Sequence, residues 1–330
     1  MHQAHAAARD WTLAGRPGTP NPADMTTTSV SEGEGRAFSL FMFVLLVLVW
    51  GLLWPAMKIA VAEIPVLSFR AIGSVLAVLS MAAVTRIAGH SLRVPRGSWT
   101  PLMIAGVFNV GAWLLLSAIG VTLIGAGRAA LIAYTMPVWA FLMGIPMLGE
   151  RATRWRLAGL ALAMAGLVIL IGEDIRRFGE APVGVLVMIG AAWCFAFGTV
   201  WQKRTDYGMP HMSVITWQLI FGAIPIVIIA LPELPDLQPV SWQAVGATLY
   251  AGMIAQVFGV ATYLWLVKRL PVKTSSLSML LVPLVGLGSA ALLLGERLGT
   301  TEIVAALFIF AAIGTAFPKD APQPPATPRR

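Results

Sequence analysis

The sequence predicts an all-α membrane protein with ten transmembrane helices arranged as two inverted five-helix repeats. Three observations predict it: the composition, the length of the apolar segments and an internal repeat. Of the 330 residues, 58% are hydrophobic and only 12% are charged, and the mean hydropathy is +0.79. A soluble domain carries about 25% charged residues, and half of that share cannot cover a water-exposed surface of this size. Lipid must therefore surround most of the chain.

Ten apolar segments follow one another between two polar tails. A helix needs roughly 20 apolar residues to cross a hydrocarbon layer of about 30 Å. The segments that meet or approach this length are 38–62, 66–89, 99–120, 124–148, 155–172, 183–202, 212–231, 242–267, 272–294 and 301–317. Their apolar runs do not alternate with polar residues, which favours helices over the strands of a closed barrel. We expect the tails, 1–37 and 318–330, to be disordered because they have little to bury; Met25 is a second candidate start.

The distribution of Lys and Arg predicts the orientation in the membrane. If the N-terminus lies inside, the inner gaps hold eleven basic residues: Arg86, Arg93, Arg96, Arg151, Arg154, Arg156, Lys203, Arg204, Lys268, Arg269 and Lys273. The outer gaps then hold four, which are Arg128, Arg176, Arg177 and Arg297. Inner loops of membrane proteins carry this excess, so both tails are expected to be cytoplasmic. These cations lie in short gaps rather than on one basic patch, so the net charge of +8 does not indicate nucleic-acid binding.

An internal repeat relates the two halves at a constant offset of 146 residues. Pro137 matches Pro283, and Leu-Gly-Glu-Arg at 148–151 matches the same four residues at 294–297. The repeats then cover 38–172 and 183–317, with five spans each. Because five is an odd number, the second half enters the membrane upside down. Inverted repeats of this kind recur in secondary transporters, whose substrate site lies near the midplane between the halves.

These motifs resemble the EamA family of the drug/metabolite transporter superfamily. The residues that carry the resemblance are Trp50-Gly51 and Lys58 in the first span, Arg70 in the second, and the Pro…Gly-Glu-Arg blocks at 137–151 and 283–297. The resemblance implies export of amino acids and other metabolites through a central cavity between spans 1–4 and 6–9, with spans 5 and 10 at the periphery. It weakens at the end of the second repeat, where Phe308-Ile309-Phe310 replaces a run of small residues.

Two prolines are the predicted hinges. Pro137 and Pro283 fall near the centres of the fourth and ninth spans, where each removes a helix hydrogen bond. A carbonyl freed at membrane depth survives only where protein or water can satisfy it. The pair could line a cavity and hinge the two halves, or it could only kink the helices statically. Gly149-Glu150 and Gly295-Glu296 are interpreted as helix-ending turns.

Three basic side chains near the outer ends of spans are candidates for attracting a substrate carboxylate or phosphate. They are Lys58, Arg70 and Arg128, of which Lys58 is the first choice, with Glu63 available as a partner. The alternative is that long cationic side chains reach the membrane interface or form local ion pairs. No Asp, Glu, Lys or Arg falls in the central half of any predicted span, which indicates facilitated or weakly coupled export rather than a buried carboxylate relay.

Tryptophan and polar residues deep in the spans predict the substrate cavity. The candidates are Trp50, Trp54, Lys58, Asn109, Trp113, Tyr134, Trp139, Trp193, Gln256, Tyr263, Ser275 and Ser276. An apolar pocket with a few hydrogen-bonding groups suits amphipathic solutes, and aromatic rings attract cations. Packing between helices explains any single Trp as well. The single Cys194 and the four scattered His residues have no catalytic or metal-ligand spacing, so neither an enzyme nor a cofactor is predicted.

The sequence therefore predicts a secondary transporter in the cell inner (plasma) membrane that exports small metabolites by alternating access. Amino acids, aromatic ones included, and amphipathic drugs are the expected substrates. A nucleotide-sugar or sugar transporter of the same superfamily is the alternative within transport, and a non-transporting scaffold is the alternative outside it. The expected partners are a small-molecule substrate and the lipid bilayer, with the protein as a monomer or homodimer.

Overall fold

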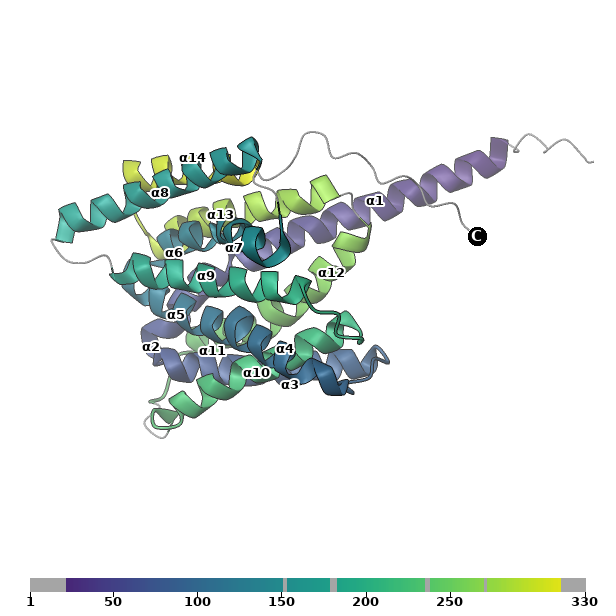
Figure 1. Ribbon diagram of the computed structural model, residues 1–330, viewed down its shortest axis with the longest axis horizontal. Coiled ribbons are helices and arrows are strands. Elements are labelled where there is room, and N and C mark those ends of the chain that lie inside the picture. The colour runs from purple at the N-terminus through teal and green to yellow at the C-terminus, as the bar shows by residue number, and fades with distance from the viewer. Residues whose placement is uncertain (1–21, 151–152, 179–182, 235–237, 270–271, 316–330) are drawn as a thin grey trace, which may run out of the picture. The chain divides into compact units, whose positions relative to one another are not determined.

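The computed structural model describes residues 22–150, 153–178, 183–234, 238–269 and 272–315, and every regular element in these ranges is helical (Figure 1). The α-helices are α1 (Pro22–Gly51), α2 (Leu53–Glu63), α3 (Val66–Ile87), α4 (Trp99–Ala105), α5 (Trp113–Ile124), α6 (Ala126–Ala133), α7 (Met136–Leu148), α8 (Arg154–Phe178), α9 (Val183–Lys203), α10 (His211–Ala230), α11 (Trp242–Leu249), α12 (Gly259–Arg269), α13 (Val272–Leu294) and α14 (Thr300–Thr315). A 3₁₀ turn, Arg96–Ser98, precedes α4. The predicted all-α class is confirmed for this part of the chain.

Seven stretches of the described chain are long and apolar enough to cross a membrane. They are Ala37–Glu63, Val66–Ile87, Arg96–Ile124, Ala126–Leu148, Val183–Lys203, His211–Ala230 and Trp242–Leu266. Three shorter apolar helices, Leu157–Gly172, Leu281–Leu294 and Thr300–Ala312, fall within the other three predicted segments. The protein is therefore a multi-pass membrane protein, and the number of ten spans stays a prediction.

The first helix begins earlier than the sequence predicts. α1 starts at Pro22, so residues 22–37 are helical although we expected them to be disordered. Extending an existing helix adds one hydrogen bond per residue and avoids the unfavourable step of helix nucleation. The apolar run after residue 37 already forms a helix, which residues 22–37 can extend. Residues up to Met42 form a unit of their own, separate from the compact unit Phe43–Arg330. The remaining predicted tail residues, 1–21 and 318–330, lie outside the described residues.

Two π-helical segments occupy matching places in the two halves. Gly106–Ala112 joins α4 to α5, and Tyr250–Phe258 joins α11 to α12. Gly106 and Gly252 are separated by the repeat offset of 146 residues. Because each glycine has no side chain, it can approach a helix of the opposite half closely: Gly106 lies against α10, and Gly252 lies against Gly73 of α3. π-helical turns often occur at functional sites, so these crossings are candidate moving parts.

Hydrogen bonds between loops show which loops lie at the same end of the helices, and they define two groups of loops at opposite ends. In the first group, the Glu63 carboxylate accepts hydrogen bonds from the backbone N–H and hydroxyl of Ser241, at 2.7 and 2.6 Å. In the second group, Ser213 donates to the Ser91 carbonyl at 2.9 Å. α3 connects the loop after Glu63 to the loop that holds Ser91, and α10 runs from Ser213 towards the loop that holds Ser241. Successive loops of this part of the chain thus alternate between the two ends.

Helices α8 and α14 pack side by side (Figure 1). Gly159 of α8 lies against Ala312 and Thr315 of α14, and Gly166 lies against Ala305 and Ile309. Glycine lets two helices approach closely in lipid. These small residues of α8 therefore serve packing within the chain.

Candidate functional site

Predicted cavity residues from several helices meet in an aromatic cluster. Trp54 of α2 is 3% exposed, and its ring centroid lies 6.4 Å from that of Trp113 at the start of α5. Trp113 in turn contacts Phe195 of α9, with ring centroids 5.2 Å apart. Gly286 of α13 also packs closely on Trp54. We name Trp54, Trp113 and Phe195 the central aromatic cluster; its rings come from both halves of the chain.

A polar network lies next to the central aromatic cluster. The Asn109 side-chain amide donates to the Phe195 carbonyl at 2.8 Å and to the Thr199 hydroxyl at 3.0 Å. Gln202 donates to Asn109 at 3.4 Å and to Gln218 at 3.0 Å. These uncharged groups bond to one another, although the buried Nε2 atom of Gln218 has no hydrogen-bond partner among the described residues. The sequence predicted Asn109 but missed Gln202 and Gln218, because a single glutamine near a helix end is not a distinctive signal.

A second pair of predicted residues joins the first span to the eighth. The Trp50 indole donates to the Ala255 carbonyl at 3.0 Å, and its ring lies 5.5 Å from the Tyr263 ring. Gly259 provides the space, because a β-carbon there would collide with the Trp50 ring. Gln256 lies on the same π-helical segment as Ala255. The two halves are thus in direct contact at this pair.

The two predicted hinge prolines occupy different structures. Pro137 is the second residue of α7, just after a break at Tyr134 and Thr135 that separates α6 from α7. The break is buried, and the Thr135 hydroxyl stabilises it by donating to the Ile132 carbonyl at 2.7 Å and accepting from the Trp139 indole at 3.1 Å. Pro283 instead lies inside the unbroken helix α13. Only the first proline therefore follows a broken helix, the kind of element that builds substrate sites in many transporters.

The three candidate cations have three different environments. The Lys58 ammonium lies 3.2 Å from the Val121 carbonyl, near the last turn of α5. The Arg128 guanidinium pairs with Glu302 of α14 at 3.3 Å, so local ion pairing accounts for it. Arg70 is only 6% exposed. The alternative that the side chain extends to the membrane interface therefore does not hold for Arg70, because this side chain points into the protein.

One predicted cavity residue, Trp193, lies outside these clusters, and the side chains of two others are not described. Trp193 is 42% exposed and stacks on Phe197 of the same helix, with ring centroids 5.7 Å apart. It faces away from the interior. The side chains of Ser275 and Ser276 lie outside the described residues. Their roles stay predictions.

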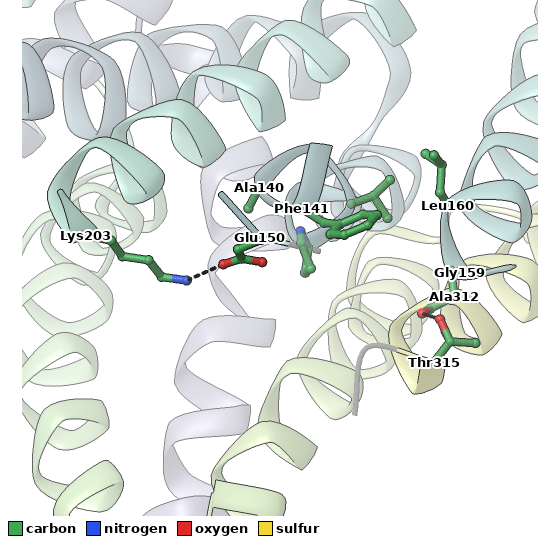
Figure 2. Close-up of a pocket in the computed structure, with 10 residues that line it drawn as sticks. Ala140, Phe141, Glu150, Gly159, Leu160, Lys203, Ala312 and Thr315 are labelled. Carbon is green, nitrogen blue, oxygen red and sulfur yellow. Dashed lines mark hydrogen bonds and ion pairs between the residues drawn. The ribbon is translucent and has the colours of Figure 1, made fainter. Parts of the chain in front are cut away.

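A pocket of about 240 Å³ lies between α7 and the pair formed by α8 and α14. Its lining residues are Pro137, Val138, Ala140, Phe141, Glu150, Gly159, Leu160, Lys203, Ala312 and Thr315. Figure 2 shows Lys203 and Glu150 on one side and Gly159, Leu160, Ala312 and Thr315 on the other. The Lys203 ammonium and Glu150 carboxylate are 4.0 Å apart. The pocket therefore combines both charges with an apolar wall, and it begins at the proline after the helix break.

Glu296 closes the opposite end of the span Ala126–Leu148. Its two carboxylate oxygens accept hydrogen bonds from the backbone N–H groups of Ala126 and Gly127, at 2.8 and 2.9 Å. These are the first residues of α6, whose N-terminal dipole favours a negative charge. Gly125, with φ of +81°, makes room, because a β-carbon there would lie 2.9 Å from the carboxylate. We call this contact the Glu296 clamp.

The repeat-related Glu150 lies at the other end of the same span. It comes two residues after Leu148, the last residue of α7, and its carboxylate lies 4.0 Å from the Lys203 ammonium. We name the two ends of the span the Gly125 end and the Gly149 end. The clamp was not predicted from the sequence, although one feature indicates it. The residue before α6 is glycine, which has no side chain to accept hydrogen bonds from the first N–H groups of α6, so these groups need an acceptor from another part of the chain.

Comparisons with known proteins agree with this architecture. The family model of EamA-like transporters matches residues 37–172 and again residues 182–317. A relative from Salmonella typhimurium, named "Probable amino-acid metabolite efflux pump", is 26% identical over 290 residues, which cover 83% of this chain and 92% of the relative. A "Probable terminal-alkyne amino-acid exporter" from Streptantibioticus cattleyicolor is 27% identical over 266 residues, covering 78% and 86%.

A solved crystal structure supports the fold. It covers 84% of this chain and 95% of its own, with a TM-score of 0.60 and 20% sequence identity. The family model accounts for most of the chain in two successive matches, and the relatives named above are transporters. The chain therefore belongs to the EamA-like transporter family and is a multi-pass membrane protein that exports small molecules.

Proposed function

We propose that this chain is a secondary transporter that exports amino acids, aromatic ones included, and related amphipathic metabolites by alternating access. The observation that carries the proposal is the unequal state of the two ends of the span Ala126–Leu148. The Gly125 end is closed by the Glu296 clamp, and the Gly149 end has a pocket of about 240 Å³. Alternating access requires one end to be closed while the other admits substrate.

The orientation rests on the basic residues. The Gly149 end lies beside Lys203 and the arginines at 154 and 204, and the Gly125 end is less basic. The rule for cytoplasmic loops then places the Gly149 end inside the cell, with both termini cytoplasmic in the inner membrane. Under this proposal, the end with the pocket is the one that opens to the cytoplasm. An exporter loads its substrate from that side.

The chemistry of the pocket supports a zwitterionic substrate. Glu150 offers a carboxylate to an ammonium group, Lys203 offers an ammonium to a carboxylate, and Phe141 and Leu160 provide an apolar wall. An amino acid presents both charges and a side chain in one small molecule. The names of the Salmonella and Streptantibioticus relatives also refer to amino acids or their metabolites.

Filling the pocket tests the proposal. Purified protein is reconstituted in liposomes loaded with a mixture of the twenty amino acids, sugars and cationic dyes, and efflux is measured by mass spectrometry and fluorescence. Ala140→Phe places a ring in the pocket, whereas Ala161→Phe places the same ring on the exposed face of α8. We expect efflux of amino acids from wild-type and Ala161→Phe protein and little from Ala140→Phe. Equal efflux from both variants, or efflux of sugars alone from wild type, would refute the proposal.

The energy source has a separate test. Because the predicted midplane carries no acidic or basic residue, we expect efflux to follow the substrate gradient with weak dependence on an imposed pH gradient. Efflux from liposomes is measured with and without a pH difference of fixed sign. Accumulation against a substrate gradient that vanishes when the pH gradient is collapsed would contradict weak coupling.

A further inference from the structure

Arg70 is a buried cation with most of its hydrogen-bonding capacity unused. Its Nη2 atom lies 3.0 Å from the Ser117 hydroxyl and 3.0 Å from the Met57 sulfur, and its guanidinium lies 5.0 Å from the Phe69 ring centroid. Its Nε atom is buried and has no hydrogen-bond partner. A guanidinium has five N–H donors and keeps its charge. Burying such a group without an anion is strongly unfavourable.

The neighbouring cations show that this situation is specific to Arg70. Near the same end of the bundle, Arg128 has a carboxylate partner in Glu302, and Lys58 has a backbone carbonyl. No ion pair of Arg70 occurs within the described part of the chain, and its burial is deeper than that of either cation. Local ion pairing, which explains Arg128, therefore leaves the charge of Arg70 without a counterion.

A small void lies beside Arg70 and is lined by both halves of the chain. Its volume of about 10 Å³ is near the minimum for one water molecule. Its walls include Ser74 and Gly73 from α3, and Gly252 and Gln256 from the π-helical segment Tyr250–Phe258. The void ends where Gly73 and Gly252 touch. Separation of α3 from the π-helical segment at this contact would enlarge it.

Gln256 adds a second donor to the same void. Its side-chain amide makes no hydrogen bond with the described residues, although it is half-buried. An amide N–H beside a guanidinium suits an acceptor with two oxygens, which a carboxylate is. Gln256 was predicted as a cavity residue from the sequence, and the structure places it next to Arg70.

We propose that Arg70, with Gln256, binds the carboxylate of the exported metabolite when α3 and the π-helical segment move apart. This inference rests on the proposed function and adds to it the class of substrate, metabolites with a free carboxylate. The structure has the site in its closed form, on the side of the bundle that the Glu296 clamp holds shut. The carboxylate replaces the missing counterion of Arg70 as the substrate crosses.

The test compares amino acids with their carboxamides, which keep the side chain and the ammonium group but lack the carboxylate. Liposomes that contain wild type, Arg70→Met, Arg70→Lys or the control Arg86→Met, at the exposed far end of the same helix α3, are loaded with both sets, and efflux is measured by mass spectrometry. We expect wild type to prefer the acids by about 10- to 100-fold, the range for one charge-assisted hydrogen bond. Arg70→Met should lose this preference while it still exports the amides, Arg70→Lys should recover part of it, and Arg86→Met should keep it.

Each other outcome separates the two proposals. Wild type that exports acids and amides equally leaves an exporter but overturns the role of Arg70. A preference that survives in Arg70→Met, or disappears equally in Arg86→Met, also overturns it. If Arg70→Met reduces the efflux of amino acids and of carboxamides to the same extent, Arg70 has a structural role and the proposal is overturned. Thermal unfolding of each variant in detergent confirms that the protein is folded, and wild type that exports neither set refutes the proposed function itself.

Discussion

The two Gly-Glu-Arg turns have the same sequence, and their Gly-Glu pairs share one backbone geometry but lie in different surroundings. Gly149 and Gly295 have φ of +68° and +66°, and in each turn the glutamate N–H bonds to a carbonyl six residues earlier. Glu296 nevertheless clamps the N-terminus of α6, whereas Glu150 lies 4.0 Å from Lys203 beside a pocket. A repeated motif therefore fixes the shape of a turn, and the contacts with the other half decide whether that end is closed.

Neighbouring positions explain part of this difference. Arg128 and Glu302 add an ion pair at the Gly125 end, at 3.3 Å. The repeat-related positions hold Thr274 and Arg156, which cannot form such a pair. Among the described contacts, the Gly125 end therefore has this ion pair in addition to the Glu296 clamp. The first prediction below changes one end and uses the repeat-related residue at the other end as the control.

The largest effect is expected for Glu296→Ala. The variant loses two hydrogen bonds to a carboxylate and leaves two backbone N–H groups without an acceptor, at a cost of about 3–6 kcal/mol in the clamped state. The control Glu150→Ala removes the 4.0 Å pair with Lys203, whose side chain is 60% exposed, and should cost less than Glu296→Ala. Unfolding free energies in mixed micelles measure both. Equal losses would show that the clamp does not distinguish the two ends.

The ion pair at the clamped end should have the next largest effect. Arg128→Met leaves the Glu302 carboxylate, which is 10% exposed, without its cation. We expect a loss of about 2–4 kcal/mol, and a double variant with Glu302→Gln should lose less than the sum of the single losses. The same micelle unfolding measures the cycle. Strict additivity would mean that the pair contributes no coupling energy.

Replacing the glycine at the clamped end should cost more stability than replacing the glycine at the pocket end. Gly125 has φ of +81° and ψ of 167°, and a β-carbon would meet the Glu296 carboxylate. Gly149 has a left-handed conformation but open space around it. We expect Gly125→Ala to cost about 2–3 kcal/mol and Gly149→Ala about 1 kcal/mol. The thermal midpoint of each variant in detergent gives the order, and the reverse order would remove Gly125 from the clamp.

The smallest effect concerns the broken helix. Thr135 stabilises the break between α6 and α7, and the repeat-related position in the unbroken helix α13 is Leu281. Thr135→Leu copies the second repeat into the first and should cost about 1 kcal/mol through the lost hydrogen bonds. It should also slow transport. Hydrogen exchange of the α6–α7 backbone measures whether the break becomes more helical, and an unchanged exchange pattern would argue against a role for Thr135.

The sequence predicted the helices and the repeat because apolar length and a repeated turn are local signals. Trp54, Trp113 and Asn109, which it named as cavity residues, contact residues of other helices, and their role in binding a substrate stays a prediction. It could not predict that Pro137 follows a break while Pro283 lies in a continuous helix, because the difference depends on Thr135 and on packing around it. Charge alone could not distinguish Lys58, which has carbonyl partners, from Arg70, whose burial results from contacts with other helices.

The distance between the loops at the Gly125 end tests the central claim most directly. Spin labels are placed at the exposed residues Leu123 and Leu298, with Cys194 replaced by serine, and double electron–electron resonance is measured in lipid nanodiscs. The account predicts a narrow, short distance distribution for the wild type and for Glu150→Ala, and a longer one for Glu296→Ala. The same distribution in Glu296→Ala as in wild type would contradict the conclusion that this carboxylate holds the end closed.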